Sequence, residues 1–203
     1  MMDRGTIGQV LVRYRGVVIA VVLLSLCASG IAFVLEGKRE KQRLEEGDAM
    51  YDALQGDYRQ VVQKLGDLSG EAKGIMARMA QFRLAAHHVR GGDVSSARSL
   101  YKNLAQDMSL GREFRELAEY LGIILAVGEG DLSQELEDRL YKLISGKDSV
   151  YRSSAREALV FIKIKKGQVE EAGKIAKEAL ADPLTNAEVK RSVENLSRVH
   201  IYK

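Results

Sequence analysis

Nineteen consecutive residues without a charged side chain, from Val17 to Leu35, constrain this chain more than any other feature. At about 1.5 Å per residue, a helix of this length spans the roughly 30 Å hydrocarbon layer of a bilayer and satisfies its own backbone hydrogen bonds there. No second apolar run of that length follows. The sequence therefore predicts one transmembrane helix over residues 17–35, a short tail over residues 1–16, and a water-exposed remainder.

A cleaved secretion signal is the alternative to a membrane anchor. Three arginines precede the apolar stretch, and Ala28-Ser29-Gly30 offers small residues to a signal peptidase. However, the stretch remains apolar from Ile31 to Leu35, which makes it longer than a signal core of about 7 to 15 residues and favours the anchor. A lipoprotein signal at Cys27 would need a small residue where Leu26 stands, so we interpret Cys27 as an apolar residue of the span.

Basic residues lie on both sides of the predicted span, so the positive-inside rule does not decide its orientation. Before the span stand Arg4, Arg13 and Arg15, and after it stand Lys38, Arg39, Lys41 and Arg43. A very short tail is easiest to leave in the cytoplasm. We therefore expect a cytoplasmic N-terminus, with the chain from Glu36 onward on the other side of the membrane.

Composition indicates that the remainder of the chain is helical and nearly neutral. Three of the 31 Lys and Arg residues and one of the 28 Asp and Glu residues precede Glu36, so the charges after it almost balance. This balance argues against a nucleic-acid partner. One proline, no tryptophan and many Ala, Leu, Glu, Lys and Arg residues predict an all-α fold. A single cysteine excludes an intramolecular disulfide.

Apolar residues recur every three or four positions along most of this remainder, as they do on one face of a helix. One such predicted face consists of Ile75, Met79, Phe82, Ala86 and Val89. The predicted helices cover residues 36–54, 57–65, 71–90, 93–108, 112–128, 131–145, 150–166, 168–180 and 185–203, with a glycine-containing break at 66–70.

Four glycines recur at the corners between successive predicted helices. They occur in Gly56-Asp57, Gly92-Asp93, Gly130-Asp131 and Gly167-Gln168, which are 36, 38 and 37 residues apart. Glycine permits a sharp turn, and the aspartate that follows it can cap the next helix. Ordinary helix ends would not recur so evenly, so the period predicts an α-solenoid of helix-turn-helix units.

The corners also predict the domain organisation. Residues 36–55 carry charges of both signs and favour a helical stalk that leads out of the membrane. Residues 56–203 form the predicted repeat domain. Its last helix follows Pro183, begins with a capping box at Thr185–Glu188, and is expected to cap the array.

The units resemble tetratricopeptide repeats at the positions that pack paired helices. That family's corner glycine, small alanine and packing residue are matched by Gly92, Ala97 and Tyr101, and again by Gly167, Ala172 and Ala176. Small residues five positions after the corner would let two helices approach closely. The match is degenerate, because the middle unit has Glu135 at the small position and the spacing exceeds the usual 34 residues.

No constellation of residues in the sequence points to catalysis. His87 and His88 are adjacent, about 100° apart around a helix, and do not converge on one metal as an i, i+4 pair does. His200 stands alone, and the sequence lacks a phosphate-binding loop, a dinucleotide fingerprint and a nucleophile elbow. We therefore expect no enzymatic activity, no cofactor, no metal and no small-molecule substrate.

Five aromatic residues lie on the predicted first helices of the pairs, and two interpretations of them remain open. They are Phe82, Phe114, Tyr120, Tyr151 and Phe161. In one interpretation they fill the core between repeats. In the other, some of them line a groove that holds a segment of a partner protein.

Taken together, the order of elements resembles the tetratricopeptide-like family that includes the ancillary subunit of the SecYEG translocon (YfgM-type). The resemblance rests on the span Val17–Leu35, the run Gly74–Ala86, the Gly92-Asp93 corner, the segment Arg115–Ala118 and the Asp182-Pro183 break. It covers nearly the full length, but these residues are typical of an architecture more than of a function.

The resemblance implies a single-span inner-membrane protein of a Gram-negative bacterium with its repeats in the periplasm. Such a protein would bind other proteins, assisting secreted clients or linking the translocon to periplasmic chaperones. Two other functions remain open at this point: an adaptor in envelope assembly or cell division with the same fold, and a regulatory or catalytic membrane protein with a polar site.

Overall fold

The computed structural model describes residues 40–41, 44–71, 74–146 and 148–200. These residues contain helices and no strand, which confirms the all-α prediction for this part of the chain. The chain divides into two compact units, residues 1–51 and 52–203, which we describe separately. In the first unit, residues 40–41 and 44–51 are helical, and that helix continues to residue 53.

The predicted tail at 1–16, the span at 17–35 and the start of the stalk lie outside the described residues. Among the helices that the structure does describe, none combines the length and apolar character needed to cross a membrane. The anchor and its orientation therefore stay predictions from the sequence.

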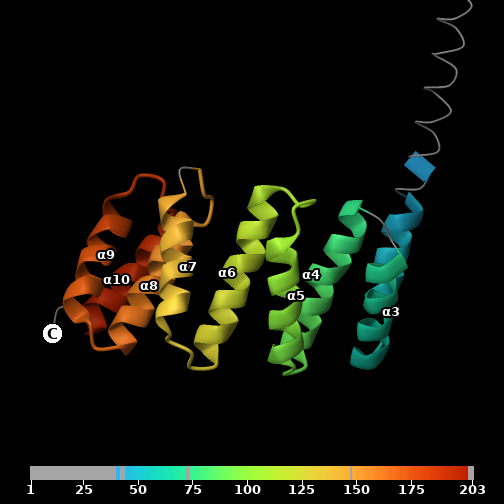
Figure 1. Cartoon of the computed structure of the whole chain (residues 1–203), viewed down its shortest axis with the longest axis horizontal. Coiled ribbons are helices and arrows are strands. Elements are labelled where there is room, and N and C mark those ends of the chain that lie inside the picture. The colour runs from blue at the N-terminus through green and yellow to red at the C-terminus, as the bar shows by residue number, and fades with distance from the viewer. Residues whose placement is uncertain (1–39, 42–43, 72–73, 147, 201–203) are drawn as a thin grey trace, which may run out of the picture. The chain divides into compact units, whose positions relative to one another are not determined.

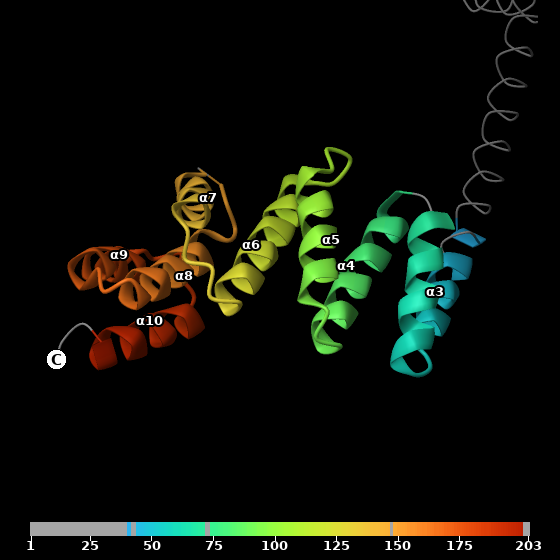
Figure 2. The same ribbon diagram turned by 60° about the horizontal axis from the view of Figure 1, so that its bottom comes forward.

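The second unit is a row of helices that alternate in direction (Figure 1). In its described residues they are α3 (Tyr58–Glu71), α4 (Gly74–Arg90), α5 (Val94–Gln106), α6 (Arg112–Gly128), α7 (Gln134–Ser145), α8 (Arg152–Lys165), α9 (Val169–Ala181) and α10 (Ala187–His200). Neighbours in sequence pack side by side, and α10 lies against both α8 and α9 (Figure 2). Short connections between antiparallel helices produce this arrangement.

Three corner glycines turn the chain in the same way, at the ends of α4, α6 and α8. Gly92, Gly130 and Gly167 have φ of +80°, +89° and +74°, values that disfavour any residue with a side chain. In each corner the residue after the glycine donates its N–H to the carbonyl five residues earlier, as in Asp93 to His88 at 2.9 Å. This Schellman geometry closes each first helix and starts the return of the chain. Gly56, before α3, also has positive φ, of +122°.

Two of the predicted helix caps form, and two others differ. The Asp57 carboxylate accepts from Gln60 N at 2.9 Å, and Gln60 Oε1 accepts from Asp57 N at 3.3 Å, so the capping box before α3 is confirmed. Asp93 Oδ1 accepts from Ser96 N at 3.1 Å and caps α5. Asp131 instead accepts from Ser133 N at 3.0 Å in a turn. Helix α7 begins at Gln134, three residues after the predicted start.

The cap of α10 is shifted by one residue from the prediction. Asn186 Oδ1 accepts from Val189 N at 2.8 Å, so Asn186 and not Thr185 is the capping residue. The hydroxyl of Thr185 is buried and lies 3.1 Å from Ser153 Oγ of α8. Thr185 thus connects the start of α10 to α8, and a capping box at Thr185–Glu188 was the wrong prediction.

The predicted break at residues 66–70 is also wrong, because α3 continues through it to Glu71. A Cβ added to Gly66 or Gly70 would meet nothing within 4 Å, so neither glycine marks a close approach or a turn. A glycine inside a helix costs only about 1 kcal/mol relative to alanine. Burial of Val61 and Leu65 against the neighbouring helix stabilises α3 despite that cost.

The five residues that the spacing predicts on one face of α4 do share one side of that helix, but none of them is fully buried. The residues of α4 that are buried are Ala77, Ala80, Leu84 and Ala85. Ile75 and Val89 are 55% and 37% exposed, and they lie on the opposite side of the helix. Small alanines are buried because α4 lies closely between α3 and α5, whereas Ile75 and Val89 point away from that contact and Phe82 packs partly against α5.

Two apolar cores hold the helices together, and α6 contributes to both. Ala118 of α6 packs with Ala97, Tyr101 and Leu104 of α5 in one core. On the other side of α6, Ile123 and Ala126 belong to a larger core with α7, α8, α9 and α10. Consequently α6 buries apolar residues on opposite faces, and neither half of the row is complete without it.

A buried ion network joins α7, α8 and α9. The side chain of Glu137 is fully buried, 2.8 Å from Lys163 Nζ and 2.7 Å from Lys166 Nζ. Lys163 Nζ also lies 2.7 Å from Glu171. Burial opposes ionisation of Glu137, but hydrogen bonds from Lys163 and Lys166 outweigh it and lower the pKa of the carboxyl. Burial likewise opposes the charge on Lys163, yet its hydrogen bonds to Glu137 and Glu171 raise its pKa to about 12.

The first testable consequence concerns the small residues of the helix pairs. Ala97 and Ala172 are 0% exposed, so replacing either by leucine should overpack its pair and cost about 1 to 3 kcal/mol of unfolding free energy. Urea unfolding of the full chain in a non-ionic detergent measures this loss. Ala187→Leu, at an exposed position of α10, is the matched control and should leave the midpoint nearly unchanged. Equal midpoints for all three variants would contradict the proposed close contact.

The second concerns the buried ion network. Glu137→Gln leaves Lys163 and Lys166 facing an uncharged side chain, with Glu171 as the remaining partner of Lys163, and should cost about 3 kcal/mol or more. Glu137→Met with Lys163→Met removes the two buried charges and should cost much less. Because folding lowers the pKa of Glu137, its stabilisation is present above the unfolded carboxyl pKa of about 4.3 and is lost as the pH falls through the folded value. Unfolding in urea from neutral to acid pH measures both effects. A double variant as unstable as the single one would contradict this account.

Candidate functional site

An apolar pocket of about 680 Å³ opens between α6, α8 and α10. Its walls are mainly aromatic and aliphatic, with one acidic and one basic side chain. The lining residues are Tyr120, Ile124, Val127, Gly128, Gly130, Leu132, Glu157, Ala158, Phe161, Lys165, Ser192 and Leu196. A hollow of this size with few polar groups is typical of a binding site for an apolar segment.

The aromatic walls of this pocket are held in place by their neighbours. Tyr120 stacks on Tyr151, with ring centroids 6.0 Å apart and planes inclined by 19°. Burial, followed by the charge of Glu157, raises the pKa of the Tyr120 phenol. Lys165 Nζ lies 5.4 Å from the centre of the Phe161 ring, a cation–π arrangement. Because these rings are fixed before any partner arrives, binding would require little ordering of side chains.

The five aromatic residues of the sequence prediction fall into two groups. Tyr120 and Phe161 line the apolar pocket, and Tyr151 supports Tyr120 from outside it. Phe82 and Phe114 lie elsewhere, 6.5 Å apart between ring centroids, and Phe82 is 6.1 Å from Tyr101. The structure therefore brings three of the five together at or beside one pocket. Phe82 packs against the core of α4, α5 and α6, and Phe114, which is 37% exposed, lies against Phe82.

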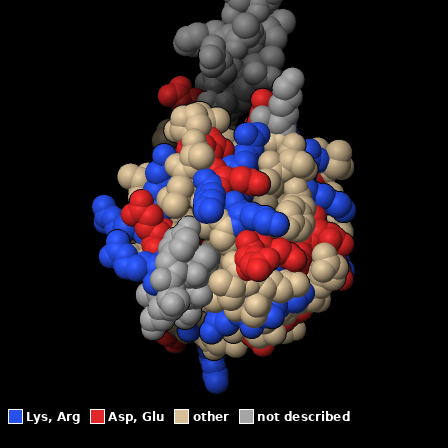
Figure 3. Space-filling view, turned by 90° about the vertical axis from the view of Figure 1, so that its left-hand side faces the viewer, with Lys and Arg blue, Asp and Glu red and all other residues tan. Residues whose placement is uncertain are grey.

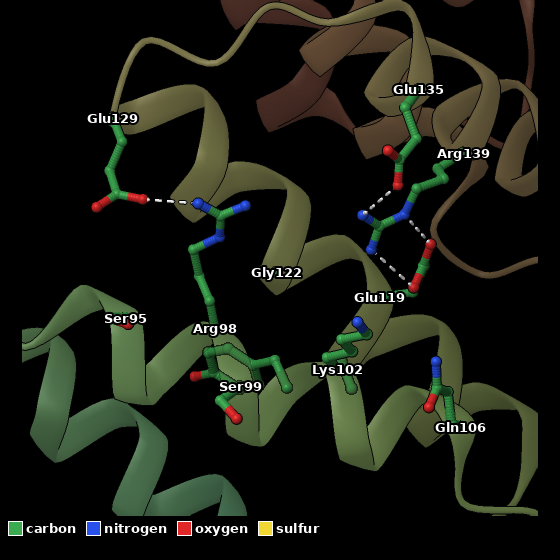
Figure 4. A pocket seen from close by; sticks show the side chains of 12 residues that line it. Ser95, Arg98, Ser99, Lys102, Gln106, Glu119, Gly122, Glu129, Glu135 and Arg139 are labelled. Carbon is green, nitrogen blue, oxygen red and sulfur yellow. Dashed lines mark hydrogen bonds and ion pairs between the residues drawn. The ribbon is translucent and has the colours of Figure 1, made fainter.

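A second pocket, of about 690 Å³, lies on the other side of α6, between α5 and α7 (Figure 4). Charged side chains dominate its walls. Arg139 of α7 donates to both carboxylate oxygens of Glu119 of α6, at 2.6 and 3.1 Å. Arg98 of α5 reaches Glu129 at 2.9 Å. Hydrogen bonding to Glu119 raises the pKa of Arg139, so the guanidinium stays charged throughout the physiological range.

The repeat pattern explains why this polar pocket exists. Five and nine residues after their corner glycines, α5 has Ala97 and Tyr101, and α9 has Ala172 and Ala176, all buried. At the same positions α7 has Glu135, whose side chain is 80% exposed, and Arg139. Charged side chains do not pack into the first helix of the pair, so α7 makes few contacts with α6 and the space between them opens to solvent.

The sequence did not predict either pocket, although it contained signals for some of the features that produce them. Glu135 at a position otherwise held by alanine was the signal for a loosely packed middle pair. The buried Glu137 and Lys163 were missed, because each stands beside a leucine or isoleucine in a segment whose apolar spacing is satisfied without it. A lone charge next to an apolar stripe is usually solvated, so periodicity alone does not reveal it.

The histidines do not assemble a metal site within the described residues, where no group of three or more His, Cys, Asp or Glu side chains is placed to hold an ion. His88 Nδ1 lies 3.1 Å from Asp93 Oδ2, at the corner between α4 and α5. Burial, then the charges of Arg90 and Arg83, lower the pKa of His87. His200 is the last residue of α10.

The surface over the C-terminal helices carries basic and acidic side chains interspersed, with neither sign gathered into one patch (Figure 3). This distribution agrees with the nearly balanced charges of residues 36–203 and gives no stripe that would follow a phosphate backbone on this face.

Comparison with known proteins finds no relative of this chain. The chain matches no family model, no curated protein and no solved structure. The proposed function therefore rests on the geometry of the pockets and on the sequence pattern.

Proposed function

We propose that this protein is a membrane-anchored interaction scaffold, and that the apolar pocket between α6, α8 and α10 binds an apolar segment of another protein. The observation that carries the proposal is the pocket itself, with the rings of Tyr120 and Phe161 exposed to it and only Glu157 and Lys165 as charged lining residues. A segment with two or three apolar side chains would bury its surface there, and a hydroxyl or charge at its edge could reach Ser192 or Lys165.

Tetratricopeptide-like architecture supports this role. Three corners with the same Schellman geometry, small buried residues at Ala97 and Ala172, and alternating antiparallel helices are the features that such a solenoid would have. Solenoids of this kind act by presenting a preformed surface to other proteins. We accordingly propose binding without catalysis, without a cofactor and without a nucleic-acid partner.

The predicted anchor gives the proposal its cellular setting. A span at 17–35 with the repeats in the periplasm would hold the pocket at high effective concentration beside other membrane proteins, so that a weak contact suffices. Together with the resemblance to the translocon-associated family, this favours secreted clients, periplasmic chaperones or the translocon as partners.

Site-specific photo-crosslinking tests the proposed pocket. A photoreactive residue in place of Ser192, which lines the pocket, should trap secretory clients, chaperones or translocon subunits in cells. The same residue in place of Leu184, which is 79% exposed outside the pocket, is the control. Phe161→Ser should reduce the Ser192 crosslinks about tenfold by removing an aromatic wall. Trapping of envelope-assembly or division proteins, or equal crosslinks at both positions, would contradict the proposal.

Protease access tests the orientation of the anchor. In spheroplasts the chain from Glu36 onward should be digested without breaching the inner membrane, and mass spectrometry should find the segment 17–35 still attached. Digestion only after the membrane is opened would reverse the orientation. A mature N-terminus at Ile31 would show a cleaved signal in place of an anchor.

A further inference from the structure

We propose that two copies of this chain associate, with the helix at residues 44–53 of each copy lying along the exposed apolar edge of α4 of the other. This inference is independent of the partner that the apolar pocket binds. It rests on two surfaces that are both partly apolar and that carry opposite charges, and both are present in every copy.

The first surface is the outer edge of α4. Ile75, Met79, Phe82, Ala86 and Val89 recur at the spacing of one helix face, which lies away from the buried alanines except at Phe82, whose ring is partly buried against α5. Ile75 is 55% exposed and Val89 is 37% exposed, so both ends of this edge lack a covering element among the described residues. The edge is about 21 Å long at 1.5 Å per residue, and the ten residues 44–53, about 15 Å long as a helix, would cover its C-terminal part beside Arg83 and Arg90.

The charges beside this edge are all positive. Between Gly74 and Arg90 the helix has Arg78, Arg83 and Arg90 and no acidic residue. Arg78 is paired with Asp107, whereas Arg83 and Arg90 are exposed on one flank of the apolar edge. Burial lowers the pKa of His87, and so do the charges of Arg90 and Arg83 beside it, as expected where positive charge is not neutralised. A covering helix would therefore be acidic.

The second surface is the helix at residues 44–53, which has this character. It contains Glu45, Glu46, Asp48 and Asp52 and no basic residue. Its apolar side chains Leu44 and Tyr51 are 65% and 66% exposed, and seven residues apart they share a face. Gly47 lies on that face too, and a Cβ there would meet nothing within 4 Å. Leu44, Gly47 and Tyr51 thus form a narrow apolar edge that a second helix can approach.

Charge placement also sets the direction of the pair. On the 44–53 helix, Glu45, Asp48 and Asp52 lie on one flank of the apolar edge; Lys41 is 3.8 Å from Glu45, and no ion pair joins Asp48 or Asp52 to a described residue. Arg83 and Arg90 lie on the corresponding flank of α4. Flanks of the same hand meet when two helices run antiparallel, so an antiparallel pair brings the carboxylates to the arginines.

A two-fold arrangement uses both surfaces of both copies. The 44–53 helix of one copy covers α4 of its partner, and the partner's 44–53 helix covers α4 of the first, so each contact occurs twice. The association is therefore expected to stop at a dimer.

Charge reversal with exchange tests the dimer. Sedimentation velocity of the full chain in a non-ionic detergent should show a concentration-dependent dimer. Glu45→Arg with Asp48→Arg, and separately Arg83→Glu with Arg90→Glu, should each raise the dimer dissociation constant about tenfold or more. An equimolar mixture of the two variants should restore dimerisation. The charge-reversed 44–53 helix of the first variant then meets the charge-reversed α4 of the second, and the unchanged acidic helix of the second meets the unchanged basic α4 of the first. Restoration by mixing also excludes a contact within one chain.

Two matched controls separate this surface from general effects. Lys174→Glu with Lys177→Glu reverses exposed charges on α9 and should leave the dissociation constant within about twofold. Val89→Ser should weaken the dimer, whereas Leu184→Ser, at another exposed apolar residue, should not. A monomer at all concentrations, a dimer that survives both reversals, or a mixture that stays monomeric would overturn the proposal. So would binding of anionic vesicles by the isolated wild-type chain through Arg83 and Arg90 without dimerisation.

Discussion

The double burial of α6 is the constraint on which the rest of the helical row depends. Most helices at a protein surface have one apolar face, but α6 packs Ala118 and Leu121 toward α5 and Ile123 and Ala126 toward the C-terminal helices. The two cores meet nowhere else among the described residues, so α6 alone transmits packing from one half of the row to the other.

In contrast to α6, helix α7 has charged residues at the positions where the other helix pairs pack. In the pairs of α4 with α5 and of α8 with α9, small buried residues bring the two helices together. In the pair of α6 with α7, Glu135 and Arg139 hold those positions, and the Arg139–Glu119 ion pair replaces apolar contact. A partly exposed ion pair contributes less than a packed side chain, so α7 is held mainly by α8 and by the Glu137–Lys163 pair. Both pockets lie beside this loosely packed pair.

How far the sequence determines this structure can be followed residue by residue. The corners at Gly92, Gly130 and Gly167 were predictable because positive φ restricts the choice of residue, and an even period makes the restriction visible. The face of α4 was not, because that helix has apolar residues on two sides and periodicity does not say which side is covered. Thr185 and Asn186 are both good capping residues, and only the contact of Thr185 with Ser153 decides between them.

The candidate pockets were less predictable than the helices for a physical reason. A pocket is a place where packing is incomplete, and its walls come from segments far apart in the sequence, as Tyr120 of α6, Phe161 of α8 and Leu196 of α10 do here. The apolar periodicity of a helix indicates which of its residues are buried. It does not indicate where two helices leave a space between them. Glu135 was the one local sign, since a charge at a packing position predicts a gap without saying which side chains will surround it.

The position of the apolar pocket has a consequence for the stability of the row. A segment bound there contacts Tyr120 and Ile124 of α6 together with Phe161 of α8, and so adds apolar contact between the two helices on either side of α7. The α6–α7 pair lacks such contact, because Glu135 is exposed where the other pairs bury alanine. Any ligand that binds only the folded arrangement stabilises it. Binding in this pocket would therefore add contact between α6 and α8, the helices on either side of α7, and so stabilise the row beside its loosely packed pair.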